Sequence, residues 1–293
     1  MTKASAVWEG LRSSLERAGA GVVYVLGSTD RGKTTLCLDL VTRLSRRGKV
    51  GYLDLDPGQS TIGPPATLGL ALYRDNPDIP EETCLRFVGS TSPRGHLLPI
   101  LAGAKRLLER ALALRTGIVI VDSPGYIHDD VATEFHLYLI DLLQPDHLIA
   151  IQEKGELEPI LAHFRGHPSM AIHRLPPSPL ARARGSAERR RYREGKFREY
   201  FAVAILHDIS LGGLGIHGRP PDSFHPDHWQ GLLVALCDPE QWVVALGIVD
   251  SIDFTTQTMR IQAPEFDAGK VTSIHVGGVR VDGGKMDPGK IRS

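Results

Sequence analysis

A glycine-rich segment near the start of the chain carries the spacing of a phosphate-binding loop. Gly27, Gly32, Lys33 and Thr34 fill the pattern G-x-x-x-x-G-K-[ST] within GVVYVLGSTDRGKTT, residues 21–35. In such a loop, backbone N–H groups cradle a polyphosphate, the lysine ammonium lies near the β- and γ-phosphates, and the hydroxyl reaches Mg²⁺. We therefore expect a nucleoside triphosphate to bind through Gly27, Ser28, Thr29, Asp30, Arg31, Gly32, Lys33, Thr34 and Thr35.

A carboxylate follows the next predicted strand. The apolar run at residues 50–54 leads into DLDPGQ, residues 54–59. We expect this strand to lie beside the phosphate-loop strand, and ligands bind at the carboxyl ends of such strands. Asp56 would then face the γ-phosphate, where it could accept a proton from an attacking hydroxyl or hold water on Mg²⁺. An ordinary Asp-Pro-Gly turn is the alternative explanation.

A third motif, VIVDSPGY at residues 119–126, is another apolar strand that ends in an acid. Asp122 at this position would order the water shell of Mg²⁺. The Asp-x-x-Gly form of the motif also resembles a GTPase switch, but the sequence lacks a guanine-reading N-K-x-D segment. The sequence therefore favours ATP, or a relaxed choice of nucleotide, over GTP.

Positive charge is concentrated in residues 181–200, ARARGSAERRRYREGKFREY, whereas the whole chain balances 34 basic residues against 34 acidic ones. Eight basic and three acidic side chains give this segment a net charge of +5. An arginine delivered to a transferring phosphoryl group would stabilise its charge, and neighbouring arginines could hold a nucleic-acid backbone. A solvated helix face is the alternative for this segment.

The elements that must position these residues alternate between strand and helix through the first two thirds of the chain. This pattern predicts an α/β fold, with a P-loop parallel sheet flanked by helices. We place strands at residues 21–26, 50–54, 85–89, 117–121, 146–152 and 171–175, and helices at 97–114 and 131–143.

The alternation of strands and helices ends at about residue 230. From there, short predicted strands are separated by Asp-Pro, Gly-Gly and Asp-Gly turns. We predict a P-loop kinase domain over residues 1–211 that includes an arginine-rich helical lid at about 176–201. A Gly- and Pro-rich linker would follow over residues 212–229, and a small β-rich C-terminal domain over residues 230–293.

Cysteine spacing and the lengths of the apolar segments bear on the compartment in which the protein works. Cys37, Cys84 and Cys237 are far apart and match no metal spacing or disulfide framework. The chain start has no apolar signal segment, and no later stretch has 18 uncharged apolar residues. His163 and His167 have ligand spacing, but flanking Gly and Pro residues predict that the helix ends there. We expect a cytoplasmic protein without membrane contact.

Taken in order, these motifs resemble the polynucleotide 5′-hydroxyl kinases, the family that includes RNA kinases of tRNA splicing, mRNA 3′-end formation and ribosomal RNA processing. The resemblance rests on Asp30 in the phosphate loop, DLDPGQ, GSTSP at residues 89–93, SPGY at residues 123–126, and the arginine segment with its end at EYF, residues 199–201. It runs from about Gly21 to Phe201 and is weaker in the β-rich tail.

The resemblance implies that the chain transfers the γ-phosphate of ATP, with Mg²⁺, to the 5′-OH end of RNA, with DNA as a further acceptor. It implies that Lys33 and Thr34 hold ATP and Mg²⁺, that Asp56 is the base, and that Arg184 and Arg189 match the family's lid arginines. The predicted catalytic residues are Lys33, Asp56, Arg184 and Arg189, and the predicted metal ligands are Thr34, Asp56 and Asp122.

The acceptor side of the site is predicted from the same comparison and from the charge pattern. Gln59 would place the metal or the acceptor, and Tyr126 would stack on a terminal base. His96 could touch a substrate phosphate, or simply belong to a turn. Arg191 and Arg193 would bind the oligonucleotide.

Two departures from the family pattern matter. Tyr126 ends an Asp-Ser-Pro-Gly-Tyr segment where members commonly have Asn-Thr-x-Gly-Trp, so a core tyrosine is the alternative to a stacking one. Eukaryotic members have an N-terminal domain that contacts the nucleotide base, whereas about 20 residues precede the first strand here. Base selectivity is therefore left open.

Two functions of other classes fit parts of the sequence. One is a catalytically weak ATP-binding adaptor of an RNA-processing complex, and the other is a GTPase-like switch. The sequence predicts no specific protein partner.

Overall fold

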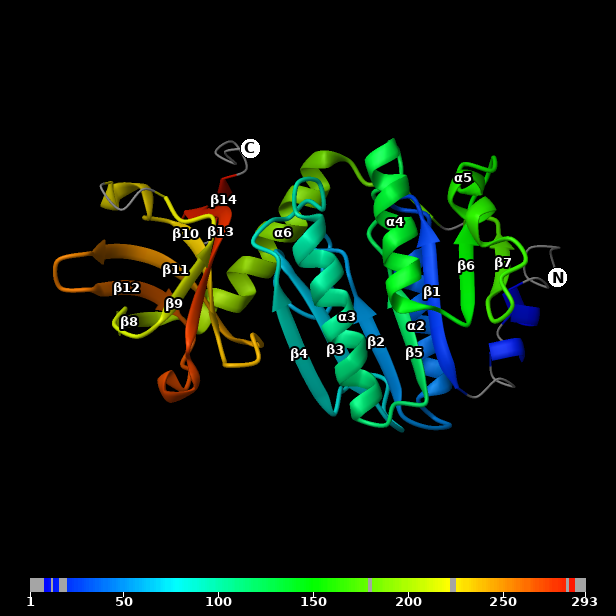
Figure 1. Ribbon diagram of the computed structural model, residues 1–293, viewed down its shortest axis with the longest axis horizontal. Coiled ribbons are helices and arrows are strands. Elements are labelled where there is room, and N and C mark those ends of the chain that lie inside the picture. Colours follow the sequence, from blue (N-terminus) through cyan, green and yellow to red (C-terminus); the bar gives the residue numbers. More distant parts are fainter. Residues whose placement is uncertain are drawn as a thin grey trace. The chain divides into compact units, whose positions relative to one another are not determined.

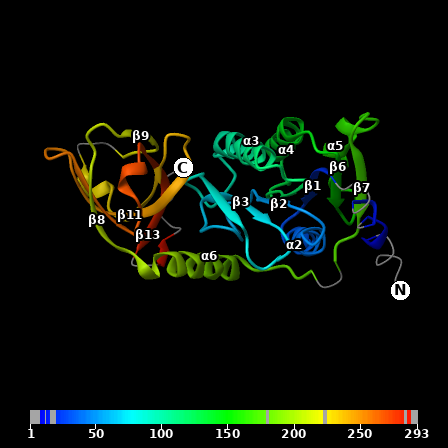
Figure 2. The same ribbon diagram turned by 90° about the horizontal axis from the view of Figure 1, so that it is seen from below.

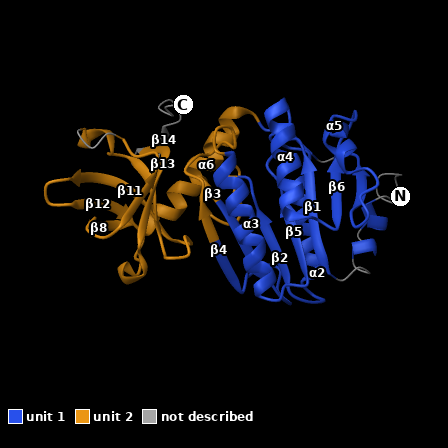
Figure 3. Cartoon of the chain, in the orientation of Figure 1, with its two compact units in different colours: residues 1–56, 68–84, 97–184 blue, residues 57–67, 85–96, 185–293 orange. Residues whose placement is uncertain are grey.

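The computed structural model describes residues 8–11, 13–15, 20–178, 181–221, 225–282 and 285–287 (Figure 1). The chain divides into two compact units, which are described separately (Figure 3). The first unit comprises residues 1–56, 68–84 and 97–184, and the second comprises residues 57–67, 85–96 and 185–293.

The first sheet has seven strands in the order β4-β3-β2-β5-β1-β6-β7. Their bounds are β1 (Gly21–Gly27), β2 (Val50–Asp54), β3 (Thr67–Tyr73), β4 (Glu82–Phe87), β5 (Ile118–Asp122), β6 (His147–Ile151) and β7 (Ala171–Leu175). The strands β2, β5, β1, β6 and β7 run parallel to their neighbours, and β3 pairs antiparallel with β2. The expected α/β architecture is confirmed, but the sheet is mixed rather than wholly parallel.

Two expectations about this sheet are wrong. The strand β3 was not predicted, because Gly69 and Ala71 within TLGLALY lower the strand propensity of a short run. The strand β2 does not lie beside β1, because β5 lies between them and pairs with both. Strand order depends on contacts between distant segments, which a local pattern does not encode.

Helices cover both faces of the parallel strands. Figure 2 shows α3 (Leu97–Ala113) and α4 (Asp130–Leu143) on one face and α2 (Lys33–Leu44) on the other. The buried side of α2 carries Leu36, Leu40 and Leu44 at the four-residue spacing of one helix face. The short α5 (Glu158–Leu161) and η1 (Ala162–Phe164) connect β6 to β7.

The second unit contains a sheet with the path β14-β13-β10-β11-β12-β8, and β9 pairs parallel with β13. Its strands are β8 (Ile205–Ser210), β9 (Gly215–Gly218), β10 (Leu232–Cys237), β11 (Val243–Asp253), β12 (Thr258–Ala263), β13 (Ser273–Asp282) and β14 (Lys285–Asp287). Its helices are α6 (Ser186–Tyr200), η2 (Phe201–Val203), η3 (Pro226–His228) and η4 (Ala268–Lys270). This β-rich C-terminal region is the one expected from the sequence.

Both faces of the second sheet are apolar. Alternate residues of β10 enter two separate clusters, with Leu233 and Ala235 in one and Val234 and Leu236 in the other. The first cluster also contains Phe197 of α6. The arginine-rich helix is therefore anchored in the core of the second unit.

The structure divides the chain differently from the predicted domain boundaries. The strand β8 pairs with β12, and β9 pairs with β13, so residues 205–218 belong to the second sheet. We had placed these residues in the P-loop domain and the linker. The side chains of β8 and β9 are mostly exposed, so these strands lack the buried apolar pattern that identifies a strand in a sequence.

Among the residues that the structure describes, no helix combines the length and the apolar character needed to cross a lipid bilayer.

Candidate active site

The phosphate loop has the predicted arrangement of strand, glycine-rich turn and helix. It connects the end of β1 at Gly27 to the start of α2 at Lys33. Gly32 has φ +95°, in the left-handed region where a side chain would be strained. The Lys33 side chain is buried over the loop, and its Nζ donates to the backbone O of Ser28 at 3.1 Å. The N–H groups at the start of α2 and this ammonium together suit a polyphosphate.

The segment after β5 packs directly on the phosphate loop. Thr29 Oγ1 donates to the Gly125 carbonyl at 3.3 Å, and a Cβ added at Gly125 would lie 2.4 Å from that hydroxyl oxygen. Ser28 Oγ and His128 Nε2 are hydrogen-bonded at 3.2 Å. The sequence signalled the Asp-x-x-Gly motif, but nothing in it singled out His128.

Asp122 connects the phosphate loop to the neighbouring strand β2. Its Oδ2 accepts a hydrogen bond from Thr34 Oγ1 at 2.6 Å and another from Tyr52 OH at 3.2 Å. The carboxyl group is buried, and loss of solvation raises its pKa, while the Lys33 ammonium and the Thr34 hydroxyl act in the opposite direction. The charge of Asp56 also raises the pKa of Asp122. These two predicted metal ligands are thus electrostatically coupled.

The predicted base Asp56 lies just past the paired ends of β2 and β5. Asp54 is the register partner of Asp122, and Leu55 N donates to the Asp122 carbonyl at 3.0 Å. The Asp54 side chain accepts from the Asp56 backbone N at 3.1 Å, which fixes the turn that presents Asp56. Asp56 is half-buried. The structure therefore brings Lys33, Thr34, Asp56 and Asp122 to one edge of the sheet.

One observation tests whether this edge suits Mg²⁺. Within the described part of the chain, Oδ1 of Asp122 is buried and has no hydrogen-bond partner. A buried carboxylate oxygen without a partner is costly, and a hard divalent cation or its bound water would satisfy it. The oxygen ligands of Thr34, Asp56 and Asp122 are of the type that Mg²⁺ prefers. These residues fit the predicted ion.

No cluster of three or more His, Cys, Asp or Glu residues with metal-ligand geometry occurs within the described ranges. A magnesium site with few protein ligands and several waters needs no such cluster.

Arg184 is held against the phosphate loop by Asp30. The Asp30 carboxylate accepts from the Arg184 backbone N at 2.8 Å and from its Nε at 2.9 Å. The Asp30 side chain is only 5% exposed, whereas the Arg184 side chain is 35% exposed, so the carboxylate is shielded from water but the guanidinium is not. Asp30 has φ +60°, a left-handed conformation that a non-glycine residue rarely adopts. The sequence predicted both residues but not their contact.

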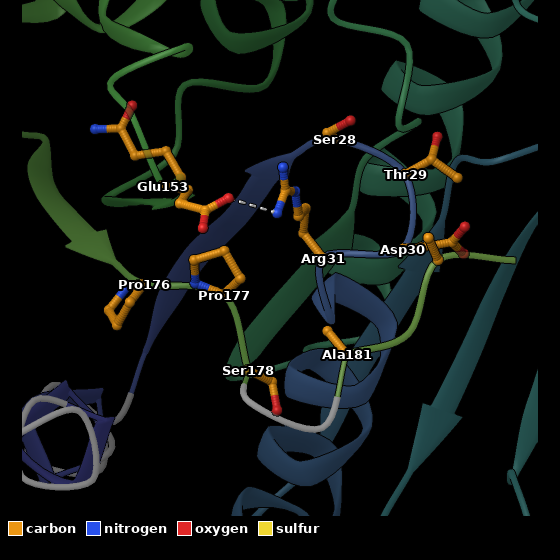
Figure 4. Close-up of a pocket in the computed structure, with 11 residues that line it drawn as sticks. Ser28, Thr29, Asp30, Arg31, Glu153, Pro176, Pro177, Ser178 and Ala181 are labelled. Carbon is orange, nitrogen blue, oxygen red and sulfur yellow. Dashed lines mark hydrogen bonds and ion pairs between the residues drawn. The ribbon is translucent and has the colours of Figure 1, made fainter. Parts of the chain in front are cut away.

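A pocket of about 610 Å³ opens beside the phosphate loop. Figure 4 shows it between the loop, Glu153 and the segment that carries Pro176 and Pro177. Arg31 Nη1 donates to Glu153 Oε2 at 3.1 Å on one side of the pocket. Its size is that of a small-molecule site.

Tyr126 is half-buried and is fixed at both ends. Its hydroxyl donates to the Asp129 carboxylate at 2.7 and 2.9 Å, and its carbonyl accepts from His136 Nε2 at 2.9 Å. The other ring nitrogen of His136 accepts from Tyr24 OH at 2.8 Å, and Asp129 also caps α4 by accepting from Ala132 N. Burial lowers the pKa of His136 to about 3, so the ring is neutral. No motif or periodicity in the sequence indicated these hydrogen bonds.

The remaining predicted residues lie in the second unit. Gln59 is half-buried, and its Nε2 donates to the Gly58 carbonyl at 2.8 Å. His96 is half-buried at the end of segment 85–96, and burial lowers its pKa. Arg189, Arg191 and Arg193 lie on α6, the first and last of them half-buried. Their roles remain predictions.

The protein-family model described as "mRNA cleavage and polyadenylation factor CLP1 P-loop" matches residues 27–203 of this chain. A Methanocaldococcus jannaschii protein named polyribonucleotide 5′-hydroxyl-kinase is 28% identical over 317 residues, which cover 89% of this chain and 87% of that protein. A protein of the same name from Pyrococcus furiosus is 34% identical over 201 residues, which cover 67% of this chain and 55% of that protein.

Solved structures share the fold. The structure of a complex of wild-type Clp1p with Pcf11p matches with a TM-score of 0.73 at 15% identity, covering 95% of this chain and 80% of that chain. A second structure of the same two proteins, described as showing an extended interface, matches with a TM-score of 0.71 at 16% identity, covering 94% and 80%. At these identities the likeness concerns the fold alone.

Proposed function

We propose that this chain, which belongs to the CLP1 P-loop family, is an ATP-dependent polynucleotide 5′-hydroxyl kinase that phosphorylates the 5′-OH end of RNA. The observation that carries the proposal is the convergence of Lys33, Thr34, Asp56 and Asp122 at one sheet edge. Relatives named polyribonucleotide 5′-hydroxyl-kinase that align over about nine tenths of the chain support the same activity.

ATP would bind with its phosphates on the loop from Gly27 to Thr35, and the pocket of about 610 Å³ beside the loop would take its nucleoside. Mg²⁺ would be held by Thr34, Asp122 and Asp56, directly or through water, and would neutralise charge on the β- and γ-phosphates. Lys33 would turn from the Ser28 carbonyl to these phosphates.

The 5′ oxygen of the acceptor attacks the γ-phosphorus in line with the leaving oxygen. The bond from phosphorus to the β–γ bridging oxygen breaks, ADP leaves, and the hydroxyl proton passes to the Asp56 carboxylate. The half-buried position of Asp56 beside the metal ligands suits this role.

Two arginines would stabilise the charge that spreads over the transferring phosphoryl group. Arg184 lies beside the phosphate loop through its pair with Asp30, and Arg189 follows five residues later on α6. Asp30 would place the Arg184 guanidinium near the reacting group before the substrate binds. The segment at residues 176–201 would thus serve as the lid.

Acceptor recognition would depend on residues that offer amide, imidazole, aromatic and guanidinium groups. Gln59 and His96 would contact the 5′-terminal nucleotide, Tyr126 would stack on its base, and Arg191 and Arg193 would bind backbone phosphates. DNA would be accepted wherever the contacts do not involve the 2′-OH.

The test uses ATP labelled at the γ-phosphate with RNA and DNA oligonucleotides of the same sequence. We expect label at the end of a 5′-OH RNA, and none on the matched 5′-phosphate RNA. Transfer to water alone would favour a GTPase-like or ATPase switch. ATP binding without transfer under any of these conditions would favour an adaptor and contradict the proposal.

A further inference from the structure

Three segments with predicted acceptor residues share one structural unit with the C-terminal sheet. They are residues 57–67, which contain Gln59, residues 85–96, which contain His96, and α6, which contains the arginines. Each is attached by specific contacts within that unit. The C-terminal sheet therefore contacts the three segments that carry the predicted acceptor residues, although the sheet itself contributes none of those residues.

Segment 85–96 is attached to the sheet by a contact between two glycines. Gly278 N donates to the Gly89 carbonyl at 2.8 Å. A Cβ added at Gly277 would lie 3.0 Å from Cα and O of Gly89 and 3.0 Å from the Leu233 carbonyl O of β10. One added at Gly89 would lie 2.9 Å from Gly277 Cα. Gly89 also has φ +76°. The backbones meet so closely that neither position has room for a side chain.

Further contacts hold both ends of the same segment. At its start, Arg86 Nη1 donates to the carbonyls of Glu240 at 2.9 Å and Gln241 at 2.7 Å. At its end, Arg219 Nη2 donates to the Gly95 carbonyl at 2.9 Å. Between the attached ends, Ser90 and Ser92 make a short turn in which Ser92 N donates to Ser90 Oγ at 3.1 Å.

The other two segments are fixed in the same unit. Val88 N donates to the Ala66 carbonyl at 2.9 Å, which joins segment 85–96 to segment 57–67. Tyr192 OH of α6 donates to the Ser60 carbonyl at 2.7 Å. Tyr200 OH of α6 accepts from Leu246 N of β11 at 2.9 Å. All three segments thus share one support.

We infer that the C-terminal sheet is the platform of the acceptor site, and that Gly277 is a positioning residue that fixes residues 89–96 for binding of a 5′-OH polynucleotide. The inference rests on the proposed function and adds a role for the β-rich region. It predicts that a substitution in the sheet weakens acceptor binding while ATP binding in the first unit is retained.

The test compares Gly277→Ala with Gly278→Ala. These glycines are neighbours on β13, but a Cβ at Gly278 meets only the Gly89 carbonyl, at 3.9 Å, so this variant is a matched control. Because an added methyl group forces the neighbouring backbone to shift, Gly277→Ala should raise the KM for a 5′-OH RNA about tenfold. The KM for ATP should change less than about twofold in both variants.

Arg219→Ala supplies a second test that leaves the sheet core intact, because the Arg219 side chain is exposed and holds Gly95 from outside. We expect it to raise the KM for the oligonucleotide about threefold, with the KM for ATP unchanged. This variant decides the question if Gly277→Ala does not fold in a thermal unfolding experiment.

Equal oligonucleotide KM values for Gly277→Ala and Gly278→Ala, together with no effect of Arg219→Ala, would overturn the inference. A parallel rise in the KM for ATP would also overturn it, since that is the signature of general destabilisation. If the unmodified protein transfers no phosphate to any oligonucleotide, the proposed function fails instead. RNA binding measured separately by fluorescence anisotropy distinguishes this result from failure of the inference about the C-terminal sheet.

Discussion

The two units divide the predicted chemistry between donor and acceptor. The phosphate loop, Asp56, Asp122 and Arg184 lie in the first unit, whereas Gln59, His96 and the arginines of α6 lie in the second. There are two exceptions: Tyr126 is a predicted acceptor residue in the first unit, and Arg189 is a predicted catalytic residue in the second. The two units also differ in construction. The first places its groups at the ends of parallel strands, whereas the second supports loops on a mainly antiparallel sheet.

This difference suggests how the acceptor can vary while the phosphoryl-transfer machinery stays constant. Groups at the carboxyl ends of buried strands are fixed by the sheet that forms the core. Loops supported from outside can change sequence with less cost to folding. The comparison therefore predicts that variants in the first unit affect mainly kcat or ATP binding. Variants in the second unit other than those at Arg189 should affect mainly oligonucleotide binding.

The largest effect is expected for Lys33→Ala. Its ammonium is buried above the loop, and no other lysine belongs to the phosphate loop. Loss of this charge should lower the rate of phosphate transfer by about 10³-fold or more, with the fold retained. Assays with labelled ATP measure the transfer rate, and circular dichroism measures whether the fold is retained. Lys105→Ala on α3 is the control variant. Near-normal turnover in Lys33→Ala would contradict the P-loop assignment.

Arginine substitutions test the boundary between the units, which falls between Arg184 and Gly185. A charge-stabilising arginine is worth roughly 10³ to 10⁵ in kcat. We expect Arg184→Ala and Arg189→Ala to lower kcat within this range. Arg184→Lys should lower kcat less than Arg184→Ala does, because it keeps the positive charge. Its kcat should still fall below that of the unmodified protein, because lysine lacks the planar guanidinium that the Asp30 carboxylate binds.

Arg191→Ala and Arg193→Ala serve as the comparison for these lid variants. They should raise the KM for the oligonucleotide and reduce its salt dependence, as expected for phosphate contacts. If Arg184→Ala and Arg189→Ala keep normal kcat and KM across salt, the helix is a solvated face and the catalytic cation lies elsewhere.

Asp56→Asn should have the next largest effect. Removal of a positioned base typically lowers kcat by about 10² to 10⁴. ATP affinity should change little, because Asp122 and Thr34 remain to hold the metal. Isothermal titration with a non-hydrolysable ATP analogue and Mg²⁺ measures this affinity. A collapse of ATP affinity would make Asp56 mainly a metal ligand.

Local patterns in the sequence were sufficient for much of the first unit. The phosphate loop, the acids after β2 and β5 and most strand positions follow from motifs that lie within about ten residues of one another. The place of β5 between β1 and β2, and the contact of Asp30 with Arg184 at a separation of 154 residues, depend on tertiary packing. No periodicity or motif contains that information.

The second unit was less predictable for a physical reason. Its segments 57–67 and 85–96 are supported by hydrogen bonds to backbone carbonyls and by the contact of Gly89 with Gly277. Backbone contacts of this kind leave little trace in side-chain patterns. The glycines themselves were visible in the sequence, but their pairing was not.

The smallest predicted effect concerns pH and the stability of the first unit. His136 is buried, and its pKa falls from 6.5 to about 3 in the folded protein. Between these two values the unfolded chain binds more protons than the folded one, so the free energy of unfolding falls as the pH falls below about 6.5. Above that pH the ring is neutral in both states and has no effect. From pH 7 to pH 5, His136 alone should account for a loss of about 2 kcal/mol.

His136→Gln tests this prediction, with the exposed His163→Gln of the same unit as the control. Both are unfolded with denaturant at pH 7 and pH 5 and followed by far-ultraviolet circular dichroism. His136→Gln should be less stable at pH 7, because it weakens the links to Tyr24 and Tyr126. Its loss of stability on acidification should nevertheless be about 2 kcal/mol smaller than that of the unmodified protein. An unchanged pH dependence would show that His136 is protonated in the folded state at pH 5, where its Nδ1 could no longer accept a hydrogen bond from Tyr24 OH.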